Sequence, residues 1–446
     1  MRPWGARMTD PGSGILAAYR LAGIAAAPFV PLVLSWRARR NKEDGNRLGE
    51  RRGLTNVPRP EGFLVWVHAA SVGETNAVLP LIGRIVAANG TVLLTTITVT
   101  SARIAAARLP AGAIHQFGPV DIQPWVARFL RHWRPGLAVF VESELWPVTM
   151  TALADSGVPQ VLVNARLSEG SFRRWRRMES TVRPLFGRLA LCLAQTPGDA
   201  ERYRAIGVKR AEVTGNLKFD APLPAPDPAT AAALGRVIGE RPVWLAASTH
   251  EGEEAIAADV HRALAESHPG LLTIVVPRHP ERGPAIAETL AASGFSAALR
   301  SAGEAIAPDT DIYIADTLGE LGLFYRLAPV AFIGGSLVPH GGQNPIEPVR
   351  FETAVLHGPH VGNFRDIYAA LDTSGSEAVA SAEELAAAVH RLLADPARAR
   401  NRVRAAAAAL RPFAGALEAT LAALKPFLDP QARSDAAGAL AVEARQ

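Results

Sequence analysis

The chain of 446 residues is long enough for two or three domains, each with a hydrophobic core of its own. Its composition, with 48% hydrophobic and 20% charged residues and a net charge of +5, is that of a globular protein. The single cysteine, Cys192, excludes an internal disulfide and any metal site built from several cysteines. Cys192 lies in the apolar run LALCLAQ, so we expect a buried, inert thiol and a reducing compartment.

The most apolar uncharged run of the chain, LAGIAAAPFVPLVLSW, occupies residues 21–36. As a helix it would reach about 24 Å, which is less than the roughly 30 Å of a membrane's hydrocarbon core. A longer helix that begins at Ile15 would reach about 33 Å, provided that Arg20 snorkels to the membrane surface. Two prolines inside the run, Pro28 and Pro31, argue against a straight helix.

The segment that follows, residues 36–60, is strongly basic, with eight Arg or Lys residues against three acids. Basic residues after an apolar segment keep the following chain on the cytoplasmic side of a membrane. A cleaved signal peptide would instead carry its positive residues before the run. We therefore expect residues 1–40 to form an N-terminal membrane anchor or interfacial helix, with a buried helix of the first domain as the alternative.

From residue 63 onward, short apolar runs alternate with stretches of helical spacing, such as PWVARFLRHW and EEAIAADVHRALAES. Strand–helix alternation of this kind indicates a parallel sheet covered by helices on both faces. The runs that we predict as strands are FLVWVHA, TVLLTTI, LAVFVE, PQVLVNA, LALCLAQ and AEVTG in the first half, and PVWLAAS, LLTIVVP, DIYIAD, VAFIGG and TAVLHG in the second.

The segment LKFDAPLPAPDPATAAA, residues 217–233, holds four prolines and separates the two sets of strands. Such a segment is typical of a hinge or linker. We therefore expect an α/β protein of two doubly wound, Rossmann-like domains, residues 41–220 and 221–428, that face each other across a cleft. Residues 429–446 are expected to be a disordered tail.

In open α/β sheets, ligands bind beyond the carboxyl ends of the strands, so the residues that follow each predicted strand are candidates for a site. Ser71 and Glu74 match the S-x-x-E capping box of a helix start, so Glu74 is either a cap or a catalytic base. Glu142 and Glu144 follow a later strand beside Trp146, and alternation would place both on one face if the strand continued that far. Other groups that follow predicted strands are Lys218, Arg278, Glu320, Gly335 and Ser336.

The stretch FIGGSLVPHGGQNPIEP, residues 332–348, places a glycine-rich loop after a strand. Glycines such as Gly335 let a ligand approach the backbone, and the helix that Asn344 and Pro345 open would offer free N–H groups to a phosphate. Glu347, one turn into that helix, could hold ribose hydroxyls, and a purely structural glycine-rich loop is the alternative. Neither a G-x-G-x-x-G nor a Walker A pattern is present, so a dinucleotide or P-loop site is not supported.

Arg278, in VVPRHPER, lies between prolines that stiffen its loop, and an arginine can hold a phosphate with two hydrogen bonds. A plain surface arginine is the alternative. The DTD motif at Asp309 to Asp311 resembles a D-x-D metal site, but it precedes its strand and so lies away from the expected cleft. The histidines also lack ligand spacing, and no metal is predicted.

A second basic stretch, residues 171–188, carries six arginines with three interleaved aromatic residues and one glutamate. A solvated charged helix is the default interpretation. Its excess of arginine beside aromatic rings fits an anionic lipid surface or a phosphorylated amphiphile better.

With these residues assembled, the chain resembles the 3-deoxy-D-manno-octulosonic acid (Kdo) transferases of lipopolysaccharide synthesis. The resemblance implies a two-domain GT-B glycosyltransferase with an N-terminal anchor in the inner membrane and its catalytic domains on the cytoplasmic side. It implies CMP-Kdo as donor, lipid IVA (the tetraacylated lipid A precursor) as acceptor, and an inverting reaction without a metal or other cofactor. The matching stretches, in family order, are WVHAASVGE, VESELWP, NARLSEGS, TGNLKFD, VPRHPER, LGELGLFY, GGSLVPHGGQNPIEP and HGPHVGNFRD.

The resemblance also implies roles for individual residues. Glu74 would act as the base, and Glu144 and Lys218 would stabilise the transition state. Two positions depart from the family pattern, because Gln343 stands where His is expected and Ser143 where Thr is usual. The residues implied to bind CMP, together with the glycine-rich loop, are Pro277, Arg278, Leu318, Gly319, Glu320, Gly335, Ser336, Asn344, Pro345, Ile346 and Glu347.

The expected partners are CMP-Kdo, lipid IVA and the anionic inner membrane, the last through residues 15–60 and 171–188, with no nucleic acid. Two other functions stay open at this point. One is a GT-B enzyme that uses a UDP-sugar on a membrane acceptor. The other is a non-enzymatic basic protein that binds anionic lipid or nucleic acid, which would make no use of Glu74 or Glu144.

Overall fold

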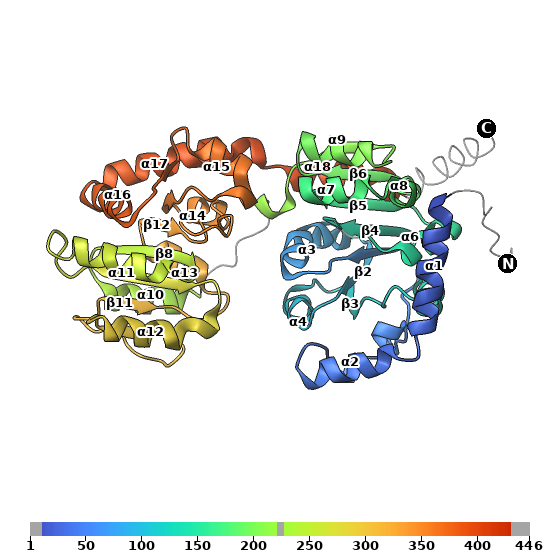
Figure 1. The fold of residues 1–446 in the computed structure, drawn as a ribbon, viewed down its shortest axis with the longest axis horizontal. Coiled ribbons are helices and arrows are strands. Elements are labelled where there is room, and N and C mark those ends of the chain that lie inside the picture. Colours follow the sequence, from blue (N-terminus) through green and yellow to red (C-terminus); the bar gives the residue numbers. More distant parts are fainter. Residues whose placement is uncertain (1–10, 144, 221–226, 430–446) are drawn as a thin grey trace. The chain divides into compact units, whose positions relative to one another are not determined.

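The computed structural model describes residues 11–143, 145–220 and 227–429. They form two compact units, the first made of the residues up to 220 together with those from 413 onward, and the second of residues 227–412 (Figure 1). Each unit contains one seven-stranded sheet in which every strand pair is parallel. The predicted α/β class with two parallel sheets is therefore confirmed.

The sheet of the first unit has the strand order β3-β2-β1-β4-β5-β6-β7. Its central strand β1 pairs with β2 on one side and with β4 on the other, so that Val65 lies between Val92 and Leu137. The strands are nearly continuous apolar runs because helices cover both faces of the sheet. They are β1 (Leu64–His68), β2 (Thr91–Thr96), β3 (Ala113–Phe117), β4 (Leu137–Val141), β5 (Gln160–Ala165), β6 (Leu191–Ala194) and β7 (Ala211–Val213).

Two apolar clusters form the core of this unit, one on each face of the sheet. Alternate residues of β1 divide between them, with Trp66 packed on Phe129 and Phe140, and Val65 and Val67 on the opposite face. The helices and short 3-10 turns that cover the sheet are α3 (Val72–Ala87), α4 (Val99–Arg108), α5 (Gln123–Trp133), α6 (Pro147–Asp155), α7 (Glu169–Arg176), α8 (Glu179–Phe186), α9 (Pro197–Ala205), η1 (Gly45–Arg47), η2 (Glu50–Arg52) and η3 (Leu217–Phe219).

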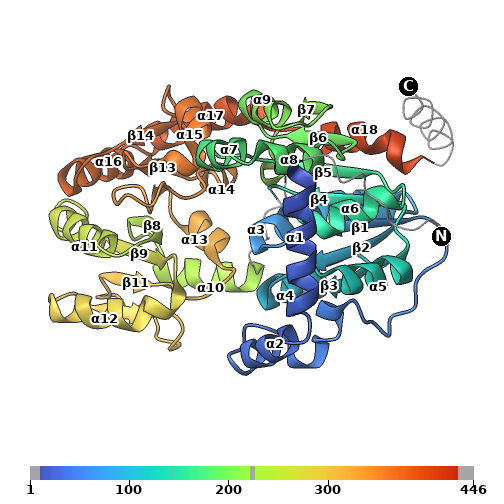
Figure 2. The ribbon, with the colours of Figure 1, turned by 45° about the vertical axis from the view of Figure 1, so that its right-hand side comes forward.

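The N-terminal apolar run forms two helices instead of one. Helix α1 (Pro11–Ala26) packs along the first unit against α5, α6 and α8 (Figure 2), and α2 (Val30–Arg39) follows it. The two are bent by 66° at a break that contains Pro28, while Pro31 lies in the first turn of α2. Because proline removes a backbone donor and clashes with the preceding turn, a straight helix through this run is not formed.

By length and composition, one helical stretch of the described residues, Pro396–Leu428, could cross a membrane, and α1 with α2 could do so only as a bent pair. The stretch Pro396–Leu428 holds two helices, α17 (Pro396–Leu410) and α18 (Ala416–Leu428). Helix α17 packs in the second unit and α18 in the first. Both are therefore surface helices of α/β units.

The sheet of the second unit has the order β10-β11-β9-β8-β12-β13-β14, and its helices pack on a core around Trp244, Val275 and Phe332. The strands are β8 (Val243–Thr249), β9 (Leu272–Pro277), β10 (Ala297–Leu299), β11 (Ile312–Ile314), β12 (Val330–Ile333), β13 (Ala354–His357) and β14 (Ser376–Ala378). The other helices are α10 (Pro228–Ile238), α11 (Glu253–Leu264), α12 (Gly283–Ala292), α13 (Leu321–Leu327), α14 (Ile346–Arg350), α15 (Arg365–Leu371), α16 (Ala382–Ala394), η4 (Pro280–Arg282), η5 (Gly362–Phe364) and η6 (Arg411–Phe413).

The chain returns to the first unit near its end, which differs from the predicted domain of residues 221–428. Helix α18 packs against α3 and η3, and its buried Ala416 and Leu424 belong to the same apolar cluster as Leu81. The Asp220 carboxylate accepts hydrogen bonds from the backbone N–H groups of Gly415 (3.0 Å) and Leu417 (2.7 Å). The apolar face of α18 therefore completes the covering of the first sheet.

Both sheets have a point at which the strand order reverses, between β1 and β4 in the first unit and between β8 and β12 in the second. In doubly wound sheets, ligands bind beyond the carboxyl ends of the strands at this switch point. Three residues at the carboxyl ends of β4, β5 and β8, namely Glu142, Asn164 and Ser248, have positive φ angles of 61°, 52° and 56°. Such a backbone is costly for residues with a Cβ and collects at functional sites.

Candidate active site

Glu74 lies at the switch point of the first sheet, in the first turn of α3, directly after β1. Ser71 caps the helix, because its Oγ accepts a hydrogen bond from the Glu74 N–H (3.3 Å). The Ser71 hydroxyl also donates to Glu74 Oε1 (2.8 Å), and the Ala70 N–H donates to Oε2 (2.7 Å). The backbone donor to the carboxylate is thus Ala70 and not the capping residue Ser71, whose N–H a capping box would use, and both carboxylate oxygens are held.

The Glu74 side chain is removed from water, with 7% of the residue exposed. Burial raises the pKa of this carboxyl, and the nearby charge of Glu142 raises it further. The hydrogen bonds from Ser71 and Ala70 and the charge of Lys218 act in the opposite direction. The net direction is upward, which brings the carboxylate closer to the pKa that suits a general base near neutral pH.

Lys218 reaches the same place from η3, a turn that Asn216 caps by accepting the Lys218 N–H (3.0 Å). Its Nζ lies 2.5 Å from Glu142 Oε1. It also lies against the first turn of α3, because a Cβ built on Gly73 would be only 3.6 Å from Nζ. The structure therefore brings Glu74, Lys218 and Glu142 together at the end of the first sheet.

Asn164 joins the two partners of this ion pair. It is fully buried at the end of β5, its Nδ2 donates to Glu142 Oε1 (3.4 Å), and its Oδ1 accepts from the Leu217 N–H (2.9 Å). An asparagine tolerates the left-handed backbone that this position requires. The sequence places Asn164 after a strand but contains no signal for this bridging role.

The expectation that Glu142 and Glu144 share one strand face required the strand to continue through both residues, and it does not. Strand β4 ends at Val141, and the left-handed backbone of Glu142 breaks the alternation at that residue. The Glu142 carbonyl accepts a hydrogen bond from the Tyr203 hydroxyl (3.2 Å), which holds this turn. Glu144 itself lies outside the described residues, so its role stays a prediction.

In the second unit, Arg278 follows β9, as predicted, and β9 is the neighbour of β8 in the sheet. Pro277 is buried at the end of the strand, and the Arg278 N–H donates to the Thr249 carbonyl (3.0 Å). The Arg278 side chain is exposed and makes no ion pair or hydrogen bond with any residue that the structure describes. It is therefore available to an anionic ligand.

The glycine-rich loop after β12 is built differently from the sequence expectation. The N–H groups of Gly335, Ser336 and Leu337 all donate to the Glu253 carboxylate, at 2.7, 3.1 and 3.1 Å. The His250 N–H donates to the same carboxylate (2.9 Å). Gly335 and Ser336 therefore cannot offer these donors to a phosphate, and their part in the site is the shape of the loop.

The segment from Asn344 to Glu347 is folded as a short helix entry. Asn344 Oδ1 accepts from the Ile346 N–H (3.0 Å), and its Nδ2 donates to Glu347 Oε1 (3.3 Å). Pro345 is the cap and the helix α14 starts at Ile346, one residue later than predicted. Burial raises the pKa of Glu347, and Asn344 and Arg350 oppose this shift.

The turn of Leu318, Gly319 and Glu320 presents one exposed apolar side chain, since 81% of Leu318 is exposed. Gly319 has a φ of 86°, which a residue with a side chain would rarely adopt. The Glu320 carboxylate is held by Arg300, with Nε–Oε2 at 2.6 Å, and this bond is the main reason that its pKa is lowered. A ligand would therefore meet Leu318 and the backbone of this turn before the Glu320 carboxylate.

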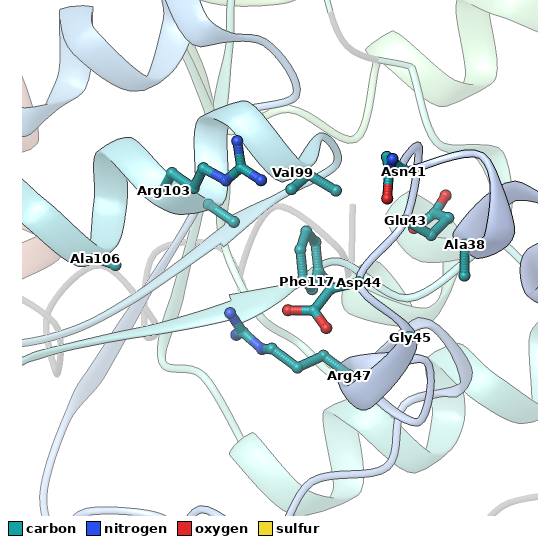
Figure 3. Close-up of a pocket in the computed structure, with 11 residues that line it drawn as sticks. Ala38, Asn41, Glu43, Asp44, Gly45, Arg47, Val99, Arg103, Ala106 and Phe117 are labelled. Carbon is teal, nitrogen blue, oxygen red and sulfur yellow. The ribbon is translucent and has the colours of Figure 1, made fainter.

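A cavity of about 470 Å³ lies elsewhere in the first unit, at the end of β3 and beside the end of α2 (Figure 3). Phe117, Val99 and Ala102 give it apolar walls, and its polar lining residues are Asn41, Glu43, Asp44, Arg47 and Arg103. Neither Glu74 nor Lys218 lines it. Its proximity to α2 could not be read from the sequence, because η1 and α4 bring the lining residues together from separate segments.

No three His, Cys, Asp or Glu side chains within the described ranges gather as a metal site. Asp311 of the DTD motif accepts the Ser296 N–H (2.9 Å) and pairs with His261 (3.4 Å), which is a structural role at the amino end of β11. The expectation of a reaction without a metal is a prediction that these observations do not test.

Comparison with solved structures places the fold in the GT-B class. A glycosyltransferase from Rickettsia africae ESF-5 aligns with a TM-score of 0.58 over 83% of this chain and 100% of that chain, at 11% identity. At this identity the likeness concerns the fold alone. It agrees with the GT-B fold predicted from the sequence.

Sequence comparison defines the family. Residues 46–221 match the pattern described as 3-Deoxy-D-manno-octulosonic-acid transferase (kdotransferase). The 3-deoxy-D-manno-octulosonic acid transferase of Bordetella pertussis is 36% identical over 91% of this chain and 98% of that protein. The probable mitochondrial enzyme of Arabidopsis thaliana is 36% identical over 85% of this chain and 88% of that protein. The chain belongs to the Kdo transferase family and is a glycosyltransferase.

Proposed function

We propose that this enzyme transfers Kdo from CMP-Kdo to lipid IVA, with inversion at the anomeric carbon and with Glu74 as the general base. The observation that carries the proposal is the buried Glu74 carboxylate, raised in pKa, beside the Lys218–Glu142 ion pair at the switch point of the first sheet. A base is needed to take the proton from the acceptor hydroxyl as it attacks.

The hydrogen bonds to Glu74 are compatible with this role. Each carboxylate oxygen has two lone pairs, and the structure uses one on Oε1 for Ser71 and one on Oε2 for Ala70. A lone pair on each oxygen therefore remains for the acceptor hydroxyl. The two bonds fix the orientation of the carboxylate, which lowers the reorganisation needed at the moment of proton transfer.

Attack on a keto sugar passes through a state with positive charge on the ring, for which neighbouring carboxylates are favourable. We assign Glu144 to this role, as the family resemblance implies, and Lys218 to stabilisation of the developing negative charge. The leaving group, CMP, is a phosphate monoester with a second pKa near 6, so it can depart without a metal when cations stabilise it. The exposed Arg278 is such a cation.

We further propose that the enzyme works at the cytoplasmic face of the inner membrane. Large apolar side chains are exposed along α1 and α2, with Leu21, Phe29 and Leu32 exposed by 63%, 66% and 69%. The Arg40 guanidinium lies over the Trp36 ring at 4.1 Å, a pairing suited to the interface between headgroups and acyl chains. The arginines of α7 lie next to α8, which packs on α1, and would attract anionic lipid.

The base assignment is tested with detergent-purified enzyme, CMP-Kdo and lipid IVA. We expect Glu74→Gln to lower kcat by about a hundredfold or more, because proton abstraction is lost while the shape of the side chain is kept. Glu61→Gln, at an exposed glutamate of the same unit, is the control and should leave the rate unchanged. A wild-type enzyme that forms no Kdo-lipid, or a Glu74→Gln variant as active as wild type, would contradict the proposal.

The identity of the donor is tested in a second experiment, which measures how far a nucleotide protects the enzyme against slow proteolysis. We expect CMP to protect the second unit and UDP to have no effect at equal concentration. Protection by UDP but not by CMP would instead support an enzyme that uses a UDP-sugar.

The cavity beside α2 is the place where we expect part of the acceptor's phosphorylated sugar to bind. Arg103 lines it, is exposed, and has no ion pair or side-chain hydrogen bond to the residues that the structure describes. Arg103→Ala should therefore raise the KM for lipid IVA several-fold and leave the KM for CMP-Kdo unchanged. Equal effects on both substrates, or none on either, would remove the cavity from the acceptor site.

A further inference from the structure

Three histidines gather at the switch point of the second sheet, and none is among the residues that the family resemblance implies. The rings of His250 and His340 are stacked, with centroids 4.4 Å apart and planes inclined by 22°. The ring of His279 lies edge-on to His250, with centroids 6.4 Å apart. They follow β8, β12 and β9, which are neighbours in the sheet, so the parallel topology itself assembles the cluster.

The stack is held by buried elements of the loop. The Glu253 carboxylate, whose side chain is fully buried, ties the His250 N–H to the loop that carries His340. Gly335 leaves room for the His250 ring, because a Cβ built there would lie 3.0 Å from Cε1 and 3.1 Å from Nδ1. Ser248, which directs the chain out of β8, keeps a left-handed backbone. A loop constrained in this way is typical of a binding site.

The electrostatics of the cluster favour an anion. The Nδ1 atom of His250 is buried and has no hydrogen-bond partner among the described residues. Burial lowers the pKa of His250, and His340 and His279 lower it too, while Glu253 and the Ser248 backbone raise it. The surroundings of His250 in the free enzyme therefore disfavour the charged imidazole. A charged imidazole becomes favourable only when negative charge arrives.

The charges that face His250 can be followed element by element. From α11, Glu253 lies 4.0 Å from Nδ1, but its carboxylate already accepts four backbone N–H groups. From the loop after β9, Arg278 adds an exposed guanidinium next to His279. The His279 ring has Glu281 at 3.7 Å on an exposed side. The cluster thus offers one exposed cation, Arg278, and one buried nitrogen without a hydrogen-bond partner, His250 Nδ1. It has no free buried anion in the part of the chain that the structure describes.

We propose that His250, His340 and Arg278 form an oxyanion subsite that binds the phosphate or the sugar carboxylate of the donor and takes up a proton when it does so. The inference rests on the proposed function, because it names a part of the donor. Arginine and protonated imidazole both donate charge-assisted hydrogen bonds to oxyanions. The proton comes from solvent when the donor binds and returns to solvent when the product nucleotide leaves.

The test uses the full chain in detergent and titration calorimetry with CMP and with CMP-Kdo. Between pH 8 and pH 6.5 we expect the affinity of the wild type for CMP-Kdo to rise, by up to about tenfold per pH unit for each proton taken up. Measurements in two buffers of different ionisation heat should show that proton directly. His250→Gln should lower the affinity about tenfold at pH 6.5 and flatten its pH dependence.

His340→Gln, at an exposed residue whose replacement leaves the core intact, should have the same effect if His250→Gln fails to fold. His390→Gln, at an exposed histidine of α16 in the same unit, is the matched control and should behave as wild type. A loss for both ligands assigns the subsite to the phosphate, and a loss for CMP-Kdo alone assigns it to the sugar carboxylate.

Wild-type affinity and pH dependence in both His250→Gln and His340→Gln would overturn this inference while leaving Kdo transfer in place. A wild type that neither binds CMP-Kdo nor transfers Kdo would remove the proposed function, and the subsite with it. The two failures are therefore distinguishable from the behaviour of the wild type alone.

Discussion

Glu74 has two neighbouring charges of opposite sign, and they act on its pKa in opposite directions. Glu142 raises the pKa and Lys218 lowers it, while burial is the largest cause of the upward shift. Lys218 lies at the amino end of α3, where the helix dipole disfavours a cation, and the ion pair with Glu142 offsets this. The basicity of Glu74 thus depends on two residues that are distant along the chain. Glu142 follows it by 68 positions and Lys218 by 144.

This arrangement predicts opposite pH effects for two substitutions. A base works only when ionised, so activity is lost as the pH falls through the pKa of Glu74 in the folded enzyme. Glu142→Gln removes a charge that raises this pKa, so the acidic limb of the kcat/KM profile should move to lower pH. Lys218→Met removes a charge that lowers it, so the limb should move to higher pH. The profile is measured between pH 4 and pH 9 with each variant.

Glu50→Gln, at a glutamate that pairs with Arg47 in the same unit, is the control and should not move the limb. Shifts in the same direction for Glu142→Gln and Lys218→Met would show that Glu74 is not the group that titrates.

At the scale of elements, the bent pair of α1 and α2 carries the exposed apolar surface. We expect the double substitution of Leu32 and Trp36 by Ser to weaken binding to anionic vesicles about a hundredfold in cosedimentation, because about 3 kcal/mol of apolar burial in the lipid is lost. Activity on detergent-solubilised acceptor should change little. Val237→Ser, at an apolar residue of α10 that is 54% exposed, is the control. Unchanged vesicle binding would exclude this surface as the membrane contact.

The contact between Asp220 and the start of α18 gives a stability prediction. Asp220→Ala leaves the N–H groups of Gly415 and Leu417 without their partner, which should destabilise the first unit by about 1 kcal/mol. The corresponding unfolding midpoint should fall by about 2–4 °C in thermal denaturation followed by circular dichroism. Glu418→Ala removes only an exposed ion pair and should have a smaller effect. Equal midpoints for the wild type and the two variants would show that the hydrogen bonds to Asp220 do not stabilise α18.

Of the fourteen strands in the described residues, eleven were recognisable as apolar runs, and the three that were not are β3, β10 and β14. All three are edge strands of their sheets. An edge strand is less buried, so its sequence carries fewer apolar residues, as AIHQF in β3 illustrates. The helix cap at Ser71 was equally visible, because its signal is local.

The contacts that complete the site were not visible in the sequence. Glu142 meets Lys218, Asn164 bridges to Leu217, and His250 stacks on His340, in each case across separate strand–loop segments. Periodicity identifies the strand that each residue follows, but only the strand order decides which loop ends become neighbours. For the same reason the sequence could suggest Gly335 as a donor but could not show that Glu253 occupies its N–H.

At the scale of the whole molecule, one family relationship covers both units of the chain. The family pattern matches residues 46–221, which belong to the first unit. The relative from Bordetella pertussis matches across 91% of the chain, so the second unit belongs to the same family relationship. The enzyme class thus applies to the chain as a whole, and the chemistry of each unit can be tested by substitutions within it.

The position of α18 at the end of the chain has a consequence for biosynthesis. The apolar face of α3 that α18 covers is made early, while α18 leaves the ribosome only after the whole second unit has been synthesised. Since domains fold as they emerge, the nascent first unit exposes this face throughout translation of the second. A nascent chain stalled before residue 413 should therefore be bound by chaperones more strongly than one released after residue 429.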